Sequence, residues 1–413
     1  MASTGNETPW ITPLVGRDRH EEHRAATPLE LFFDLTFVVA VAAAASELHH
    51  GLAEGHWSNL GGYLVTFFGI WWAWMNYSWF ASAYDTNDVV WRVLTFVQMA
   101  GVLVLAAGVP RAFADGDYGV VVLGYAIMRA PMVVQWLRAA HADEDRRATA
   151  RSYAAGIQLM QLLWVGWLLL GSPGGVALLL LLVAGELLVP VVAERHGTTP
   201  WHPAHMVERY GLMTIIVLGE VLLSTTRAIS GSLDEHGITG PLLLAIVGGL
   251  LVVFCLWWFY FKHSYEERLA EEDRDSPWLW GYGHYVIYAS VAAVGAGLGA
   301  CIDVVEHVAH VSSRAAALTL GLPVAAYLLM LGWLHGVDSA SWKTLRRGVA
   351  TSVVVIAVCL AGLETGLTVL LVGVVLVLAL AEFLVRDRDR VATADNERKA
   401  ASGQSVENMH GSE

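Results

Sequence analysis

The chain has 413 residues, of which 55% are apolar and only 15% are charged, against roughly 25% charged residues in a soluble domain. A soluble protein of this length could bury a large core, but it could not hide a dozen separate apolar stretches of about 20 residues, the length that spans a bilayer. The formal net charge of −13 gives no indication of nucleic-acid binding.

Residues 1–27 are polar and mixed in charge, and no apolar stretch comes before Leu29. This segment lacks the apolar core of a signal peptide. We therefore expect a cytoplasmic N-terminal segment, followed by a first span that stays on the chain and directs insertion.

Twelve apolar stretches follow this segment. Backbone groups in lipid need partners within the same structure, which leaves helices and closed barrels as spanning elements. These stretches are too long and too uniformly apolar for barrel strands, which alternate. The sequence therefore predicts an all-α, polytopic membrane helical bundle of about twelve transmembrane helices. The expected spans are 29–50, 57–80, 89–110, 118–140, 150–171, 174–195, 208–230, 240–262, 278–306, 313–335, 345–364 and 366–385.

Lysine and arginine residues are distributed unevenly between the two ends of these spans. Of the 25 in the chain, twenty lie on the side of the N-terminus, the loops after even-numbered spans and the tail. Arg111, Arg227 and Arg314 lie on the other side, and Arg92 and Arg129 fall inside spans. By the positive-inside rule, both ends of the chain are predicted to be cytoplasmic, in a multi-pass protein of the cell (plasma) membrane.

The two halves of the helical part resemble each other. Residues 29–39 align with residues 207–217, which pairs Glu30 with Glu208, and three further matches follow in the same order at later spans. With six spans per half, both halves point the same way, as in transporters built from parallel repeats; alternatively, a duplication made a scaffold with no meaning for transport. The predicted parts are the N-terminal segment 1–27, two six-helix repeats at 28–195 and 196–385, and a disordered cytoplasmic tail at 386–413.

Two carboxylates lie at the start of the first span. An ionisable group at the centre of a span costs about 2.5–3.5 kcal/mol on insertion scales, so each such residue requires a reason. Glu30 and Asp34 are four residues apart and share one helix face. Because they repel each other, they predict a proton, a cation or an arginine between them. The alternative is an interfacial pair that the cytoplasm solvates.

The seventh span carries a second set of charges. It begins with Glu208 and Arg209, and Glu220 lies about 18 Å deeper at 1.5 Å per residue. Arg209 and Glu220 point nearly the same way, so Arg209 either holds Glu220 or orients an anion. His284 in the ninth span is a hydrogen-bonded core residue or, near an acid, a proton relay. The candidate solute-binding or ion-binding residues are Glu30, Asp34, Glu208, Arg209, Glu220 and His284.

Arg92 and Arg129 are the basic residues inside spans. A buried, unpaired arginine is very costly, so both are predicted to neutralise intramembrane acids. The expected partner is Asp34 for Arg92, and Glu47 or Glu220 for Arg129.

Other polar residues in the spans point to structural roles. Glu186 and Glu382 have leucine-rich surroundings, which favours interhelical hydrogen bonds or capture by a basic residue. Cys255, Cys301 and Cys359 fall inside apolar stretches without metal or redox spacing and are expected to be small core residues.

Two loop motifs carry residues that could bind an ion. His202, His205 and Glu208 have plausible metal spacing, but a proline breaks the helix there, so a loop and helix entry is the favoured interpretation. Asp85 and Asp88 are expected to form a turn and a helix cap. The sequence shows no nucleotide-binding loop, nucleophile elbow or zinc-protease motif, so we expect no enzyme activity, metal or cofactor.

Several motifs resemble a known family. Residues 29–38 read LELFFDLTFV, and residues 205–210 and 215–220 read HMVERY and IIVLGE. Together with WWFYF at 257–261 and YGH at 282–284, they resemble the bacterial low temperature requirement A (LtrA) family over residues 28–385. The resemblance implies a multi-pass membrane protein linked by name to growth in the cold, without an established reaction or transported molecule. The loop at residues 84–88 departs from the more acidic run expected there, which weakens its interpretation as an ion site.

Four functions remain open from the sequence. We expect a secondary transporter or permease for an unknown small solute or ion, with the first and seventh spans lining a central path. The alternatives are a cation channel, suggested by a faint analogy to a lysosomal potassium-channel family, and a non-catalytic stress or assembly factor. An intramembrane enzyme acting on a lipid or secondary metabolite would need a nucleophile or metal at recognisable spacing. The expected partners are the lipid bilayer and the solute or ion, with no nucleic acid.

Overall fold

The computed structural model describes residues 9–19, 21, 24–171, 175–235, 237–262, 269, 276–336 and 342–386. All regular secondary structure in these residues is helical, as the sequence predicted. The tail prediction falls on residues 387–413, which lie outside this part of the chain. The helices are α1 (Pro28–Glu54), α2 (Asn59–Tyr84), α3 (Val89–Ala114), α4 (Gly119–Ala142), α5 (Arg147–Leu169), α6 (Gly175–Ala193), the short η1 (Glu194–His196), α7 (Pro203–Glu235), α8 (Gly240–Phe261), α10 (Ser276–Val305), α11 (Ser313–Gly336), α12 (Trp342–Leu360) and a last helix, Thr365–Arg386.

Each predicted span overlaps one of these helices. Nine helices of the described residues are long and apolar enough to cross a membrane, and α2, α5 and α12 are not among them. Helix α2 is less apolar because tryptophan, tyrosine and asparagine replace aliphatic residues over much of its length. The helices α5 and α12 each begin with two arginines or more within their first two turns.

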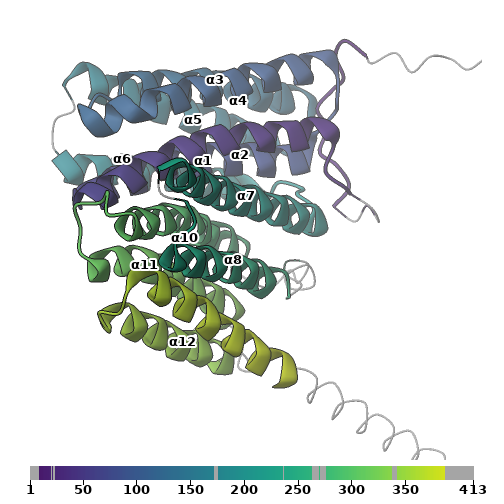
Figure 1. Cartoon of the computed structure of the whole chain (residues 1–413). Helices are drawn as coiled ribbons and strands as arrows, with labels where there is room; N and C mark the ends of the chain where they lie inside the picture. Colours follow the sequence, from purple (N-terminus) through teal and green to yellow (C-terminus); the bar gives the residue numbers. More distant parts are fainter. Residues whose placement is uncertain are drawn as a thin grey trace, which may run out of the picture.

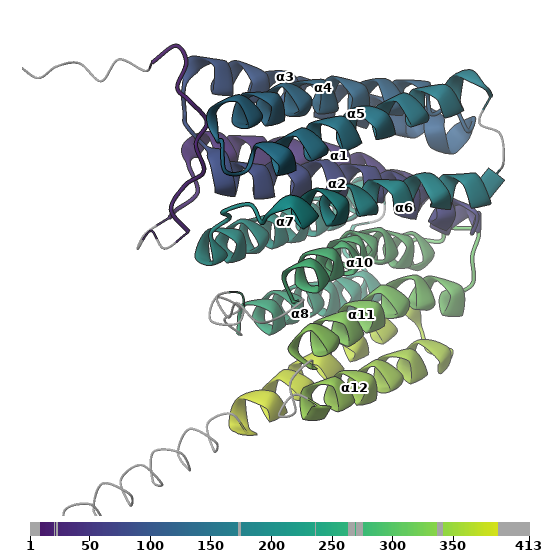
Figure 2. The ribbon, with the colours of Figure 1, turned by 180° about the vertical axis from the view of Figure 1, so that it is seen from behind.

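The helices lie side by side in an elongated stack, with α3, α4 and α5 at one end and α12 at the other (Figure 1). The view from behind shows the same order (Figure 2). In both views the segment before α1 and the C-terminal end of the last helix lie on the same side of the stack. This placement agrees with an even number of crossings, while the cytoplasmic orientation of this side stays a prediction.

Helix α10 is the central element of the stack. It packs against α1, α7 and α11, and 89% of its most apolar 18-residue stretch is buried inside the protein. Small residues permit this close packing. A Cβ atom on Gly297 would lie 2.4 Å from the carbonyl oxygen of Thr319 on α11, and one on Gly299 would lie 2.8 Å from the ring of His49 on α1.

Local capping sets where α1 and α3 begin. Thr27 and Glu30 form a capping box at the start of α1, which fixes Glu30 in the first helical turn. Asp88 caps α3 by accepting a hydrogen bond from the backbone N–H of Trp91. Asp85 accepts from the backbone N–H of Asn87, so the acidic loop forms the predicted turn and cap.

Replacing Gly297 by alanine tests the packing of α10 against α11. The added methyl group has no room, and overpacking a filled interface costs about 1–3 kcal/mol. We therefore expect a lower midpoint of thermal unfolding in detergent. The matched control is Gly219→Ala in α7, where a Cβ atom would meet nothing within 4 Å. An equal midpoint for both variants would contradict the packing described for α10.

Candidate functional site

Arg209 joins α7 to α1 in the interior of the protein. Its Nη1 donates to Glu30 Oε1 at 2.9 Å, its Nε donates to Asp34 Oδ2 at 3.0 Å, and its Nη2 donates to Asp34 Oδ1. The side chains of all three residues are fully buried. Glu30 and Asp34 therefore share one arginine. Their spacing of four residues on α1 brings both carboxylates within reach of the same guanidinium.

Three further charged or titratable groups adjoin this pair. His205, one helical turn before Arg209, places Nε2 3.2 Å from Glu30 Oε1. Arg24 places Nη2 3.7 Å from Glu30 Oε1 and also 3.7 Å from Asp85 Oδ2. Burial, followed by repulsion from Glu30, raises the pKa of the Asp85 carboxyl above its ordinary value. We call the set Arg24, Glu30, Asp34, Asp85, His205 and Arg209 the charge cluster.

Side chains of α2 complete the polar contacts of the charge cluster. Trp74 Nε1 donates to Asp34 Oδ1 at 2.8 Å, and the Arg209 Nη2 group also donates to Ser78 Oγ at 3.1 Å. The ring of Tyr77 lies 5.9 Å from the Arg209 guanidinium carbon, within the range of a cation–π contact. The charge cluster therefore connects α1, α2 and α7.

The charges in this cluster do not balance when His205 is neutral. Two arginines face three carboxylates, and all six side chains are buried. An uncompensated buried charge is strongly unfavourable. Among the described residues, neither ring nitrogen of His205 makes a hydrogen bond of good geometry. A proton on His205, or on the Asp85 carboxyl with its raised pKa, would restore neutrality, so the arrangement is suited to binding one proton.

The arginine between Glu30 and Asp34 is thus Arg209, and the prediction that Arg92 pairs with Asp34 is wrong. Because the capped turn starts α3 at Val89, Arg92 lies in the first turn of that helix. Its Nε donates to Asn87 Oδ1 at 3.0 Å at an exposed position. Arg92 therefore lies at the start of α3, on the side of the protein that holds the N-terminal segment, rather than in the interior.

Arg129 pairs with Glu186 rather than with Glu47 or Glu220, which corrects the second predicted ion pair. Arg129 Nη2 lies 2.9 Å from Glu186 Oε2, with both side chains buried. Among the described residues, four groups donate to the Glu186 carboxylate: Arg129 Nη2, Trp72 Nε1, Tyr125 Oη and Trp164 Nε1. This confirms that Glu186 forms interhelical hydrogen bonds and binds a basic residue.

The structure does not place Glu208 and Glu220 in the charge cluster. Glu208 is exposed and accepts a hydrogen bond from the backbone N–H of Ala26 at 3.0 Å. Glu220 is buried, accepts from Ser224 Oγ at 2.9 Å and lies 3.8 Å from Arg227 Nη1. The predicted contact between Arg209 and Glu220 is absent. Arg209 lies about three turns before Glu220 on α7, and its guanidinium is hydrogen-bonded to Glu30 and Asp34 of α1.

His284 is a neutral, hydrogen-bonded residue in an aromatic environment. Its Nδ1 lies 2.7 Å from the carbonyl oxygen of Trp280, which can only accept, so Nδ1 carries the proton. Its Nε2 then accepts from the hydroxyl of Tyr260 at 3.0 Å. Tyr210 packs edge-to-face against both His284 and Trp74, so aromatic rings connect His284 to the charge cluster.

The spaced histidines of the α6–α7 connection do not converge on a metal. His202 Nε2 lies 2.8 Å from the carbonyl oxygen of Glu21, whereas His205 faces Glu30. Within the ranges that the structure describes, no group of three His, Cys, Asp or Glu side chains could hold a metal ion.

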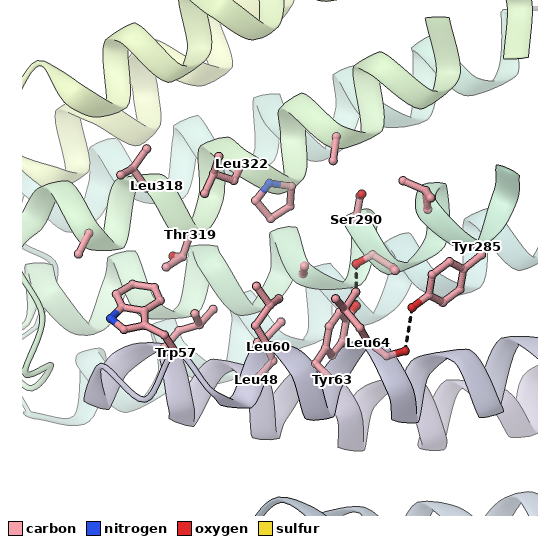
Figure 3. A pocket seen from close by; sticks show the side chains of 17 residues that line it. Leu48, Trp57, Leu60, Tyr63, Leu64, Tyr285, Ser290, Leu318, Thr319 and Leu322 are labelled. Atoms are coloured by element: carbon pink, nitrogen blue, oxygen red, sulfur yellow. Dashed lines mark hydrogen bonds between the residues drawn. The ribbon is translucent and has the colours of Figure 1, made fainter. Parts of the chain in front are cut away.

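An apolar cavity lies between α1 and α2 on one wall and α10 and α11 on the other (Figure 3). Its volume is about 440 Å³, and its lining is almost entirely apolar. The hydroxyls of Tyr63 and Tyr285 do not point free into it, because they donate to the carbonyl oxygens of Ala289 and Leu64. Such a lining suits hydrocarbon rather than an ion.

A second cavity of about 210 Å³ lies at the opposite end of α2 and is more polar. It is bordered by the segment before α1, the connection between α6 and α7, and the start of α10. In the sequence its only indication is weak: many of the 17 tryptophans cluster near the ends of apolar stretches. We call it the aromatic cavity, after the rings of Trp79, Phe80, Trp136, Tyr153, Trp201 and Trp278 that line it.

Comparison with known proteins agrees with the motifs in the sequence. The family model described as bacterial low temperature requirement A protein (LtrA) matches residues 25–384. An uncharacterized protein of Rhizobium meliloti is 27% identical over 309 residues, which cover 71% of this chain and 72% of that protein.

Replacing Arg209 by glutamine tests the central ion pair. The change leaves two buried carboxylates without their cation, and breaking a buried pair in this way costs about 3–5 kcal/mol. We expect a large drop in thermal stability, partly restored when Asp34→Asn is added. Arg92→Gln is the matched control and should change stability by less than about 0.5 kcal/mol. Equal stability of R209Q and R92Q would contradict the assignment.

Proposed function

Because the chain belongs to the bacterial low temperature requirement A family, we propose that it is a secondary transporter or permease for a small solute in the cell membrane. In this proposal all twelve long helices cross the bilayer, and the side that holds the N-terminal segment faces the cytoplasm. The charge distribution supports this orientation, since the basic residues gather on that side.

The observation that carries the proposal is the contact surface between α2 and α10, which we call the α2–α10 seam. The aromatic cavity lies at one end of the seam, where Trp79 and Trp278 line it. The apolar cavity lies further along, where Tyr63 and Tyr285 line it. A transporter needs a path that opens to one side at a time, and two separated cavities on one seam fit that need.

Aromatic side chains fill the seam between the two cavities. We call Phe68, Trp71, Trp72, Tyr282 and Tyr285 the aromatic barrier. Trp71 is fully buried, and its ring centroid lies 5.3 Å from that of Tyr285 and 6.2 Å from that of Tyr282. Trp72 lies 5.7 Å from Tyr282. These contacts close the path, so the structure corresponds to an occluded or resting state of the proposed transporter.

The charge cluster supports coupling to protons. It borders the seam through α2, because Trp74 donates to Asp34 and Trp79 Nε1 donates to the hydroxyl of Tyr210 at 3.0 Å. A proton taken up at His205 would change the charge that holds α1 and α7 together. Since α2 is hydrogen-bonded to both helices, that change would reach the wall of the aromatic cavity.

Removing the centre of the aromatic barrier tests the path. Trp71→Ala should let proteoliposomes containing trapped pyranine lose an imposed pH gradient severalfold faster than wild-type protein, because the two cavities would join. A buried Trp→Ala change costs about 3–5 kcal/mol, so Trp71→Phe is the milder variant and should give an intermediate leak. The indole N–H of Trp71 makes no hydrogen bond within the described residues.

The control for this experiment is Trp57→Ala, at the rim of the apolar cavity, where the side chain is 52% exposed. It should leave the gradient intact. A parallel screen should apply organic cations, carboxylates, amino acids and sugars to wild-type proteoliposomes on a solid-supported membrane. Failure of every class to evoke a current, with a tight barrier in W71A, would overturn the transport proposal.

Replacing His205 by glutamine tests proton binding by the charge cluster. Burial lowers the pKa of His205, so a step from about pH 8 to about pH 5, below the ordinary range of histidine, should drive positive charge into wild-type protein and give a transient current. The current should be largely lost in H205Q and retained in His202→Gln. An unchanged current in H205Q would show that another group binds the proton. The charged groups that act on the His205 ring are Glu30, Arg24 and Arg209, and His202 accepts from its backbone N–H. Asp34, Asp85 and Tyr77 adjoin these arginines rather than His205 itself.

A further inference from the structure

The rings of the aromatic cavity present several π surfaces to one space. Trp79 stacks with Trp278 at an interplanar angle of 10° and a centroid distance of 6.1 Å, and it meets Trp201 edge-to-face at 4.8 Å. On another wall, Trp136 stacks on Tyr153 at 4.1 Å. The faces of such rings attract cations, and recognition of ammonium groups by aromatic cages rests on this attraction.

One carboxylate also lines the aromatic cavity, and it is held in place. Glu194 accepts from the hydroxyl of Tyr153 at 2.8 Å, and from the backbone N–H and the hydroxyl of Thr199, both at 2.9 Å. These neutral donors fix the carboxylate and add no positive charge of their own. The cavity therefore combines several rings with a negative group, the usual chemistry of a site for an organic cation.

A cation of the protein already uses this chemistry. The guanidinium carbon of Arg19, in the segment before α1, lies 5.1 Å from the centroid of the Trp201 ring. Arg19 lines the cavity and is only half-buried, so it could leave without unfolding a helix. Its place over Trp201 shows that this ring accommodates a delocalised cation.

We propose that the aromatic cavity binds a small organic cation with a guanidinium or quaternary ammonium group, which replaces Arg19 over the ring of Trp201. This rests on the proposed function in one respect, since the cation would be the transported solute. With Arg19 displaced, Glu194 supplies the one opposite charge among the described lining residues. A volume of about 210 Å³ limits the ligand to a small compound.

The test is equilibrium binding of radiolabelled tetramethylammonium to the purified full-length protein in detergent at constant ionic strength. We expect saturable binding that Arg19→Ala strengthens severalfold, because the competing guanidinium is gone. Arg17→Ala is the matched control in the same segment, since Arg17 pairs with Glu21 instead, and it should change nothing. Trp201→Ala and Glu194→Gln should each weaken binding at least tenfold, whereas Trp201→Phe, which keeps a ring, should weaken it less.

The outcomes separate this inference from the transport proposal. Binding of tetramethylammonium without any flux would support the cation site and count against transport. Flux of another solute without binding of tetramethylammonium would support transport and count against the cation site. Saturable binding of benzoate in place of tetramethylammonium would overturn the inference, and so would weaker binding in R19A. Melting curves of each variant without ligand show whether lost binding reflects lost folding.

Discussion

A buried guanidinium between α1 and α7 is the interaction on which the rest of the structure depends. Arg209 is fully buried, and this is tolerable only because two carboxylates one helical turn apart on α1 accept its hydrogen bonds. The geometry fixes the rotation of both helices and the position of one along the other. Trp74 then reaches Asp34, and Tyr210, the next residue after Arg209, packs against Trp74 and bonds with Trp79. One ion pair thus positions the wall of the aromatic cavity.

The two buried ionic networks differ in a way that suggests different roles. Around Glu186, one arginine faces one carboxylate and three neutral donors complete the shell. The single positive charge and the single negative charge of that network balance each other. The charge cluster has three carboxylates for two arginines, beside a histidine that lacks a well-formed hydrogen bond in the described structure. Its balance depends on one proton, which makes it the part of the fold most suited to switching.

Sequence reasoning predicted the helices well and their partners poorly. The spans follow from length and hydropathy, which are local properties, and the cap at Asp88 follows from residue type. Ion pairing is not local, because it depends on which helices meet and how each is rotated. The predicted span 89–110 begins where α3 begins, so the error at Arg92 lies elsewhere: the sequence does not show that the first turn of this helix lies at the surface rather than in the interior. The aligned residues Glu30 and Glu208 also show this limit, since one is buried and the other exposed. The two-repeat arrangement stays a prediction.

Coupling between the charge cluster and the α2–α10 seam follows from how α2 is bonded. Along one helix, Trp74 is tied to α1 through Asp34, Trp79 to α7 through Tyr210, and Trp72 to α6 through Glu186. Trp72 belongs to the aromatic barrier, and Trp79 to the aromatic cavity. Because Glu186 is balanced and the charge cluster is not, protonation would loosen or tighten the α1 and α7 attachments of α2 while its α6 attachment stays fixed. Trp72 and Trp74 lie near the middle of α2 and Trp79 lies in its C-terminal half, so a change at Trp74 and Trp79 with Trp72 held would turn the helix about its middle. The resulting tilt of α2 against α10 is the movement that would open the seam at one end and close it at the other.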